Sequence, residues 1–319
     1  MTSMDYRLIK YTPSYLTSLT TLLDKSFSIE NKDKEELVKW KYFDEYLDNK
    51  TITYIALDDK NEVISHYTNI PINVVCLGTM YKAMICTDMC TDISHRGKGL
   101  ISKLSSEVYK EVKDSKYDFS LGFSNDAGIK IDKNSISYGY EVVGKFVRYL
   151  KLVASRKKAA YSLIRVSSLE DNFYNSSSNF LKIRKDSSYL NWRYLKKPNS
   201  EYNVYAIKEA STIHGYVVLR FLENRCYIYD IITESDDIKH MIKILRSIEN
   251  KALDHGIRII IYNVLDNKYW RKLFNRYKYL KKSKNKINYY ATIKIHSDGI
   301  SKEFILDKEN WLLMNGDII

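Results

Sequence analysis

The residues best suited to chemistry form a basic, glycine-containing segment, Arg96-Gly97-Lys98-Gly99, between a strand-like run and an amphipathic helix. Two glycines let the backbone bend tightly, and the first N–H groups of a helix have no partner within that helix. Arg96 and Lys98 add positive charge at the same end. The segment therefore predicts a nest for the phosphates of a pyrophosphate group.

The elements that must position this segment are read from the spacing of apolar side chains. Residues 98–113 carry apolar residues at helical spacing, and Gly78 marks a hairpin turn between two strand-like runs. The spacing predicts helices over 15–27, 34–47 and 98–113, and strands over 51–57, 62–75, 80–91, 119–123 and 141–153. This order predicts an antiparallel sheet that leads into one strand–helix–strand crossover.

A series of echoes predicts an internal duplication. The Trp-Lys-Tyr-Phe of residues 40–43 returns as Trp-Arg-Tyr-Leu at residues 192–195, an offset of 152. Later pairs keep the same order with falling offsets of 149, 142 and 137: Ile64 with Ile213, Asp88 with Asp230, and Gly139-Tyr140 with Arg276-Tyr277. We interpret the chain as a tandem repeat with a shorter second copy and a junction near 154–167. The alternative is one large α/β domain with a long insertion.

The segment around Arg96 resembles the acetyl-CoA-binding signature of the GNAT superfamily of N-acetyltransferases, Arg/Gln-x-x-Gly-x-Gly/Ala between the fourth strand and the next helix. Arg96 and Gly99 match its first two defined positions, whereas Ile101 stands where Gly or Ala is usual. Asn125 and Gly139-Tyr140 resemble the Asn after the family's fifth strand and its closing Gly-Phe. The resemblance covers about residues 5–150, and it reaches 185–295 only through the repeat.

The resemblance implies a mechanism and a set of site residues. In such folds the fourth and fifth strands splay apart, pantetheine pairs with the backbone of the fourth strand, and an amine attacks the thioester directly. The residues that it assigns to acetyl-CoA binding are Met89, Cys90, Thr91, Arg96, Gly97, Lys98, Gly99, Leu100, Ile101 and Asn125.

Two residues are the candidates for proton transfer. Asp88 stands where many family members carry a catalytic glutamate, and a carboxylate in a desolvated cleft has a raised pKa suited to a base. The alternative for Asp88 is a strand residue that faces solvent. The tyrosine that often protonates the leaving thiolate is replaced by Ser135, so Tyr138, beside the closing glycine, is the substitute candidate. His95 takes the place of the aromatic residue that precedes the arginine.

The resemblance, extended by the repeat, predicts an α/β (α+β) fold of two GNAT-like domains, each a mixed, mostly antiparallel sheet flanked by helices. The predicted units are an N-terminal domain with the acetyl-CoA loop (1–153), a degenerate second domain (154–295) and a tail with a last strand (296–319). The second copy has no glycine after its fourth strand but carries Glu234, Asp236 and Asp237. We therefore expect a single CoA site, in the first copy, with the second copy shaping an acceptor cleft or serving structure.

Composition excludes several classes of protein. The 319 residues contain no run of about 18 apolar residues and no apolar segment at the start, so we expect neither a membrane span nor a signal peptide. Four irregularly spaced cysteines favour reduced thiols in the cytoplasm, and they offer no second ligand pair for a metal. The net charge is +12, and the basic residues are most concentrated over 268–286. Such a basic stretch is more often a solvated surface than a binding site for an anion.

These observations predict a cytoplasmic acyltransferase that moves acetyl from acetyl-CoA to an amine of a small molecule or sugar, without metal or nucleic acid. One alternative is an aminoacyl transferase like the peptidoglycan-bridge enzymes, in which residues 268–286 would bind RNA. Those enzymes do not need an Arg-Gly-x-Gly loop. A second alternative is a non-catalytic CoA or nucleotide sensor, which the missing family tyrosine favours.

Overall fold

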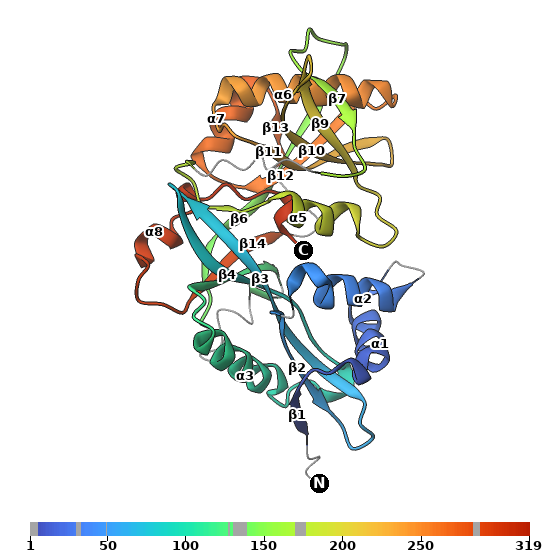
Figure 1. Ribbon diagram of the computed structural model, residues 1–319, viewed down its shortest axis with the longest axis vertical. Helices are drawn as coiled ribbons and strands as arrows, with labels where there is room; N and C mark the ends of the chain where they lie inside the picture. Colours follow the sequence, from blue (N-terminus) through green and yellow to red (C-terminus); the bar gives the residue numbers. More distant parts are fainter. Residues whose placement is uncertain are drawn as a thin grey trace.

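A long mixed sheet runs through the molecule and belongs to two lobes (Figure 1). The computed structural model describes residues 6–29, 33–48, 50–126, 128–129, 139–169, 177–282 and 288–319. The main path of the sheet has the order β1-β2-β3-β4-β5-β14-β6-β12-β11-β10-β9-β7. The chain thus has the α/β fold that the sequence predicts.

The first lobe carries helices α1 and α2 on one side and α3 on the other (Figure 1). Its elements are β1 (Arg7–Lys10), α1 (Leu16–Phe27), α2 (Lys34–Phe43), β2 (Ile52–Leu57), β3 (Val63–Cys76), β4 (Thr79–Thr91), α3 (Leu100–Asp114), β5 (Phe119–Asn125) and β6 (Glu141–Leu152).

The second lobe repeats this order of strands and adds the C-terminal segment. Its elements are β7 (Ser162–Arg165), β8 (Lys182–Ile183), α5 (Ser187–Leu190) with a π-helical turn (Asn191–Leu195), β9 (Asn203–Glu209), β10 (Thr212–Leu222), β11 (Arg225–Thr233), α6 (Ile238–Asp254), β12 (Ile259–Leu265), α7 (Lys268–Tyr277), β13 (Leu280–Lys281), β14 (Tyr289–Ile295) and α8 (Lys302–Leu306).

Each lobe has one parallel strand pair, and a helix connects it. Strand β4 runs parallel to β5 across α3, and β11 runs parallel to β12 across α6. Leu100, Leu104, Val108 and Val112 form the buried stripe of α3. Because they recur every four residues, they lie on one face of a helix, and this apolar face packs against the sheet.

The lobes exchange strands where they meet. The first part of β6 pairs with β14, and its second part, Phe146–Leu152, pairs with β12 of the second lobe. Strand β14 lies in the range 154–295 predicted for the second domain, but it pairs with β5 along its whole length. Each lobe therefore completes its sheet with a strand that continues from the other, and the sheet does not divide at residue 153.

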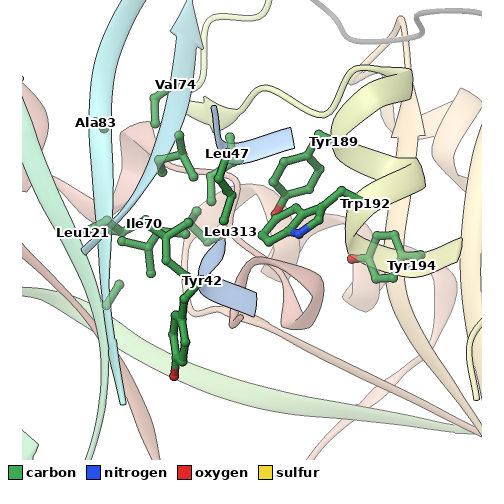
Figure 2. Close-up of a cluster of buried hydrophobic side chains, with 14 of the residues drawn as sticks. Tyr42, Leu47, Ile70, Val74, Ala83, Leu121, Tyr189, Trp192, Tyr194 and Leu313 are labelled. Atoms are coloured by element: carbon green, nitrogen blue, oxygen red, sulfur yellow. The ribbon is translucent and has the colours of Figure 1, made fainter. Parts of the chain in front are cut away.

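The interface contains a near-symmetric pair of tryptophans. Trp40 Nε1 donates to the carbonyl of Trp192 at 2.7 Å, and Trp192 Nε1 donates to the carbonyl of Trp40 at 2.9 Å. The rings stack with centroids 5.5 Å apart. Figure 2 shows Trp192 with Tyr189 and Tyr194 beside Tyr42 and Leu47 of the first lobe. The Trp-basic-Tyr echo of the sequence is thus a pair of core contacts between the lobes.

The C-terminal segment differs from the expected last strand. Residues 302–306 form α8, and the only strand-like contacts of the described tail beyond β14 are single bridges at Trp311 and Met314. A turn over Asn315–Asp317 then directs the last two residues back between the lobes. Side-chain contacts bend this segment: Asp317 Oδ2 accepts from the N–H of Met314 at 2.7 Å, which closes a turn instead of extending a ladder.

Candidate functional site

Strands β4 and β5 separate near their carboxyl ends. Their pairing joins Ala83–Cys86 to Phe119–Gly122 and ends there, while β5 continues to pair with β14. A cavity of about 430 Å³ occupies the widened part, lined by Thr87, Asp88, Met89, Phe123, Asn125 and Thr292 among others. This is the gap that the sequence resemblance implies for pantetheine.

A β-bulge places Asp88 at the edge of this cavity. The register between β3 and β4 shifts between His66 and Thr68, and Asp88 adopts a left-handed backbone conformation with φ +50°. His66, which is fully buried, lies 3.1 Å through Nδ1 from the Asp88 carbonyl. Because burial lowers the pKa of His66 to about 4, the ring is neutral, and its Nδ1–H donates to that carbonyl. The bulge aims Asp88 away from the regular ladder.

Two residues of α2 hold the Asp88 carboxylate. Lys41 Nζ and the Tyr42 hydroxyl both donate to Asp88 Oδ2. Burial raises the pKa of Asp88, but the Lys41 charge and the hydrogen bonds from Lys41 and Tyr42 outweigh burial, so that its pKa lies below the usual value. The expected raised pKa is therefore wrong. Asp88 is an ionised hydrogen-bond acceptor at neutral pH, and a weak base.

A second cavity meets the first at Asp88. It has a volume of about 490 Å³ and lies between α1 and α2 on one side and residues 197–202 with Arg220 of β10 on the other. Asp88 and Phe27 line both cavities. The backbone oxygen of Ile319, at the same junction, accepts from Lys41 Nζ at 3.2 Å and from Thr87 Oγ1 at 3.3 Å. Asp88 thus lies where ligands in the two cavities would come into contact.

The glycine segment forms an open turn at the start of α3. Gly97 and Gly99 have φ of +78° and +70°, and a Cβ at either position would meet nothing within 4 Å. Gly99 is the N-cap residue and supplies no side chain to the first-turn N–H groups. Arg96 is held over the turn by a hydrogen bond from Nε to the Thr91 carbonyl at 3.1 Å. These features fit a phosphate-bearing ligand.

The cavity between β4 and β5 also contains a polar atom suited to a ligand. Thr292 of β14 is buried, and its Oγ1 finds no hydrogen-bond partner among the described residues. A Cβ on Gly122 would lie 2.6 Å from this oxygen, so glycine is needed there. An unpaired buried hydroxyl costs free energy unless a ligand or water satisfies it, which favours a ligand with polar groups in this cavity.

The other predicted site residues are placed as follows. Met89 lines the cavity, Cys90 and Thr91 pair with His66 and Ser65 of β3, and Leu100 and Ile101 open α3, where Leu100 is buried. Asn125 lines the cavity, and its Oδ1 accepts from the N–H of Gly128 at 2.9 Å. Lys98 donates to the Tyr6 hydroxyl at 2.5 Å and still lies at the exposed turn. Tyr138 lies outside the described residues.

Sequence reasoning missed three residues of the site. Lys41 and Tyr42 bind Asp88. The Trp-basic-Tyr echo includes both residues, but it does not indicate what their side chains contact. Tyr140 lines the cavity and accepts a hydrogen bond from the Tyr109 hydroxyl at 2.8 Å. The sequence marked Tyr140 only as the counterpart of the family's closing Phe, and that likeness does not place its side chain in a cavity.

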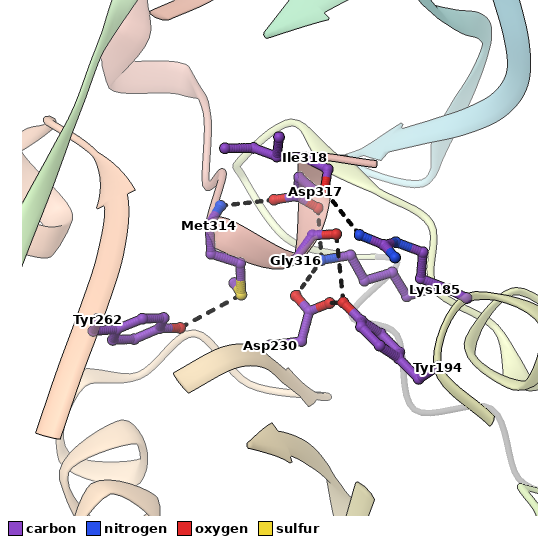
Figure 3. A network of polar contacts seen from close by, with 9 residues as sticks. Lys185, Tyr194, Asp230, Tyr262, Met314, Gly316, Asp317 and Ile318 are labelled. Carbon is purple, nitrogen blue, oxygen red and sulfur yellow. Dashed lines mark hydrogen bonds and ion pairs between the residues drawn. The ribbon is translucent and has the colours of Figure 1, made fainter. Parts of the chain in front are cut away.

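Asp230, which the repeat pairs with Asp88, belongs to a network of polar contacts in the second lobe (Figure 3). It is fully buried and accepts from the Tyr194 hydroxyl and from Lys185. Lys185 also pairs with Asp317 Oδ1 at 2.6 Å. The tail turn at Gly316 fills the space against Asp230, where even a Cβ on that glycine would come within 2.2 Å of the carboxylate.

The part of the basic stretch that the structure describes, 268–282, does not present an uninterrupted positive face. Arg271 pairs with Asp266 and Glu309, and Lys281 pairs with Asp266 at 2.8 Å. The opposite face of α7 is buried through Trp270, Leu273 and Phe274. Among the described residues, no group of three His, Cys, Asp or Glu is placed to hold a metal ion, and no helix has the length and apolar character of a membrane span.

Comparison with known proteins relates the first lobe to a family. Residues 7–143 match the family model described as an acetyltransferase (GNAT) domain. The fold is similar to that of a conserved protein of unknown function from Enterococcus faecalis V583, a probable N-acyltransferase (TM-score 0.70, 17% identity, 92% of this chain and 72% of that one).

Two further solved structures show the same fold. One is a GCN5-related N-acetyltransferase from Anabaena variabilis (TM-score 0.66, 14% identity, 92% of this chain and 73% of that one). The other is Saccharomyces cerevisiae N-myristoyltransferase with bound myristoyl-CoA (TM-score 0.60, 10% identity, 93% of this chain and 83% of that one). No curated protein sequence matches the chain.

Proposed function

Because residues 7–143 match the GNAT acetyltransferase domain and the whole fold resembles that of a probable N-acyltransferase, we propose that the chain is a GNAT-type, acyl-CoA-dependent N-acyltransferase with one active centre, at Asp88. The observation that carries the proposal is that two cavities meet at Asp88, one of them in the β4–β5 gap of the lobe that contains the glycine turn. In this proposal the β4–β5 cavity takes pantetheine and the acyl group, with acetyl as the first candidate. The cavity between the lobes takes an amine of a small molecule or sugar.

The proposed reaction is a direct transfer. The amine nitrogen forms a bond to the acyl carbon, the C–S bond breaks, the amine loses a proton and the thiolate gains one. Asp88, with its lowered pKa, accepts a hydrogen bond from the amine and orients it, and the proton passes on to water. Burial raises the pKa of Tyr42 well above its usual value, so the Tyr42 hydroxyl keeps its proton and holds Asp88 in place.

We further infer that the two lobes arose by tandem duplication. Reciprocal hydrogen bonds of Trp40 and Trp192, and tyrosine hydroxyls on both Asp88 and Asp230, support this inference. A cytoplasmic location is also part of the proposal, because all four cysteines are buried and none forms a disulfide bond, as in a reducing compartment.

The test of the proposed function is binding and turnover of acetyl-CoA by matched charge-reversal variants. Arg96→Glu places a carboxylate at the glycine turn, and we expect the Kd for CoA to rise at least about 30-fold, or about 2 kcal/mol. Lys110→Glu, on the exposed face near the other end of α3, makes the same charge change and serves as the control. Calorimetry measures Kd, and thiol release with a panel of amines measures turnover.

Both variants should retain the wild-type unfolding transition, because both side chains are exposed. Equal loss of CoA affinity in Arg96→Glu and Lys110→Glu would show a general charge effect, which is contrary to a site at the glycine turn. Tight CoA binding without turnover of any amine would instead support a non-catalytic CoA sensor.

A further inference from the structure

The cavity between the lobes has a chemical character that bears on its ligand. One wall is apolar and comes from α1 and α2, with Phe27, Leu37 and Val38. The opposite wall comes from the second lobe and carries Lys197 and Arg220. A ligand that fills this space must therefore satisfy an apolar side and a cationic side at once.

Two of the three cations that line this cavity are already paired. Lys41 binds Asp88, and Arg220 binds Glu201 through both Nε and Nη2. Lys197 is the exception: among the described residues, no carboxylate lies within ion-pair distance of its ammonium group. Its Nζ lies 5.5 Å from the ring centre of Trp40 and 5.2 Å from that of Tyr202. The two aromatic rings hold the cation in the cavity wall without neutralising it.

The surroundings of Lys197 favour an anion. Burial, followed by the charges of Arg193, Lys41 and Arg220, lowers the pKa of Lys197 to about 8. Arg193 is itself buried beneath this wall and donates to the Ile318 carbonyl at 2.8 Å. Several positive charges thus converge here, and the two carboxylates that line the cavity, Asp88 and Glu201, are already bound to Lys41 and Arg220. An anionic group placed here would gain from all of them.

We propose that the acceptor is a small amine that also carries an anionic group, a carboxylate or a phosphate, which pairs with Lys197. This inference rests on the proposed function and specifies its substrate class. The amine end would lie at Asp88 and the anionic end at Lys197, with the apolar part of the acceptor along Phe27 and Val38. Lys197 acts as a specificity residue, which binds the acceptor at a distance from the reacting nitrogen.

The experiment compares acceptors that differ by one anionic group. Thiol release from acetyl-CoA is measured for the full chain with leucine against leucinamide, phenylalanine against phenylalaninamide, and glucosamine 6-phosphate against glucosamine. We expect kcat/KM for the anionic member of at least one pair to exceed that of its neutral partner about 100-fold, because a site built for an ion rejects the analogue that lacks it. The amino acid pairs and the sugar pair distinguish a carboxylate from a phosphate.

Lys197→Met removes the charge and keeps a side chain of similar length against Trp40. We expect it to reduce the preference for the anionic member at least about 10-fold, through a higher KM for that member. Lys196→Met, at the exposed neighbouring lysine, is the matched control and should change neither value.

Each outcome decides the inference. Equal kcat/KM for both members of every pair overturns it, and so does a preference that Lys197→Met leaves intact. If Lys197→Met does not fold, the paired acceptors with the wild-type chain still decide. If the chain binds acetyl-CoA and turns over neutral amines as well as anionic ones, the inference of an anionic acceptor is overturned and the proposed function stands. Failure of the wild-type chain to bind acetyl-CoA in calorimetry would overturn the proposed function itself and this inference with it.

Discussion

Asp88 and Asp230 lie at irregular points of the fourth strand of their lobes, and each accepts a hydrogen bond from the tyrosine of a Trp-basic-Tyr motif. Their surroundings differ. The Asp88 side chain is 25% exposed and lines two cavities, whereas Asp230 is fully buried against Lys185 and the tail turn. An aspartate that accepts from a tyrosine hydroxyl thus lines two cavities in one lobe and is part of the core in the other, and only Asp88 has a positive φ.

The helix that follows each strand differs in a corresponding way. Helix α3 begins at Gly99, which leaves its first-turn N–H groups without a side-chain cap. Helix α6 begins after Asp237, whose carboxylate accepts from the N–H groups of Lys239 and His240 at 2.8 and 3.0 Å. The second lobe thus supplies its own anion at the position where the first is open to an external one. A single CoA site, in the first lobe, stays a prediction.

The largest expected effect separates the two aspartates by stability. Asp230→Ala leaves the buried Lys185 with one carboxylate and the Tyr194 hydroxyl with only its longer contact, 3.4 Å, to the Gly316 carbonyl, so we expect a loss of about 3–5 kcal/mol in the free energy of unfolding. Asp88→Ala breaks a partly exposed ion pair and should cost about 1 kcal/mol. Urea unfolding of both variants measures the difference.

Activity should show the opposite order. In the proposed mechanism Asp88→Ala lowers kcat about 100-fold, since a group that orients the amine and accepts from it is lost. Asp230→Ala should keep most of the kcat of whatever fraction remains folded. Equal losses of stability in the two variants would remove the distinction between an open and a structural centre.

The second effect is a pair of opposite pH dependences. Burial raises the pKa of Asp317 to about 6, with Lys185 opposing and Asp230 adding to the shift. The folded state then binds more protons than the unfolded state between pH 4 and 6, so this group makes stability fall, by about 2 kcal/mol, as pH rises through that window. The lowered pKa of Asp88 has the opposite sign, because its stabilisation is lost as pH falls below about 4.

The comparison of wild type with Asp317→Asn and Asp88→Asn isolates these contributions. Asparagine at 317 can still accept from the N–H of Met314 but does not titrate. The free energy of unfolding of wild type minus that of Asp317→Asn should fall as pH rises from 4 to 6. The free energy of unfolding of wild type minus that of Asp88→Asn should stay nearly constant over the same range. A flat difference for Asp317→Asn would contradict the raised pKa.

The smallest expected effect on stability comes from exchanging the two helix caps. Gly99→Asp gives α3 a carboxylate cap at an exposed residue, and Asp237→Gly removes the cap of α6, each at a cost of a few tenths of a kcal/mol to about 1 kcal/mol. CoA affinity should fall at least about 10-fold in Gly99→Asp and remain unchanged in Asp237→Gly. Calorimetry with CoA checks both. Weaker binding in Asp237→Gly would indicate a CoA site in the second lobe.

Much of this chain follows from local patterns. The glycine turn, the apolar stripe of α3 and the Trp-basic-Tyr echoes each involve a few adjacent residues, so backbone and side-chain periodicity are enough to find them. The acidic residues after β11 were equally visible, and they include the cap of α6. The family resemblance rests on these same local features.

Only the tertiary structure decided the exchange of β6 and β14 between the lobes, the two cavities and the charge state of the centre. The pKa of Asp88 depends on Lys41 and Tyr42, 47 and 46 residues away. Together they lower this pKa, whereas burial alone would raise it. Strand partners and ion pairs join residues far apart in the chain, and a sequence does not state which of them meet. The physical reason is that pairing energies depend on distance in space, while sequence patterns report only neighbours along the chain.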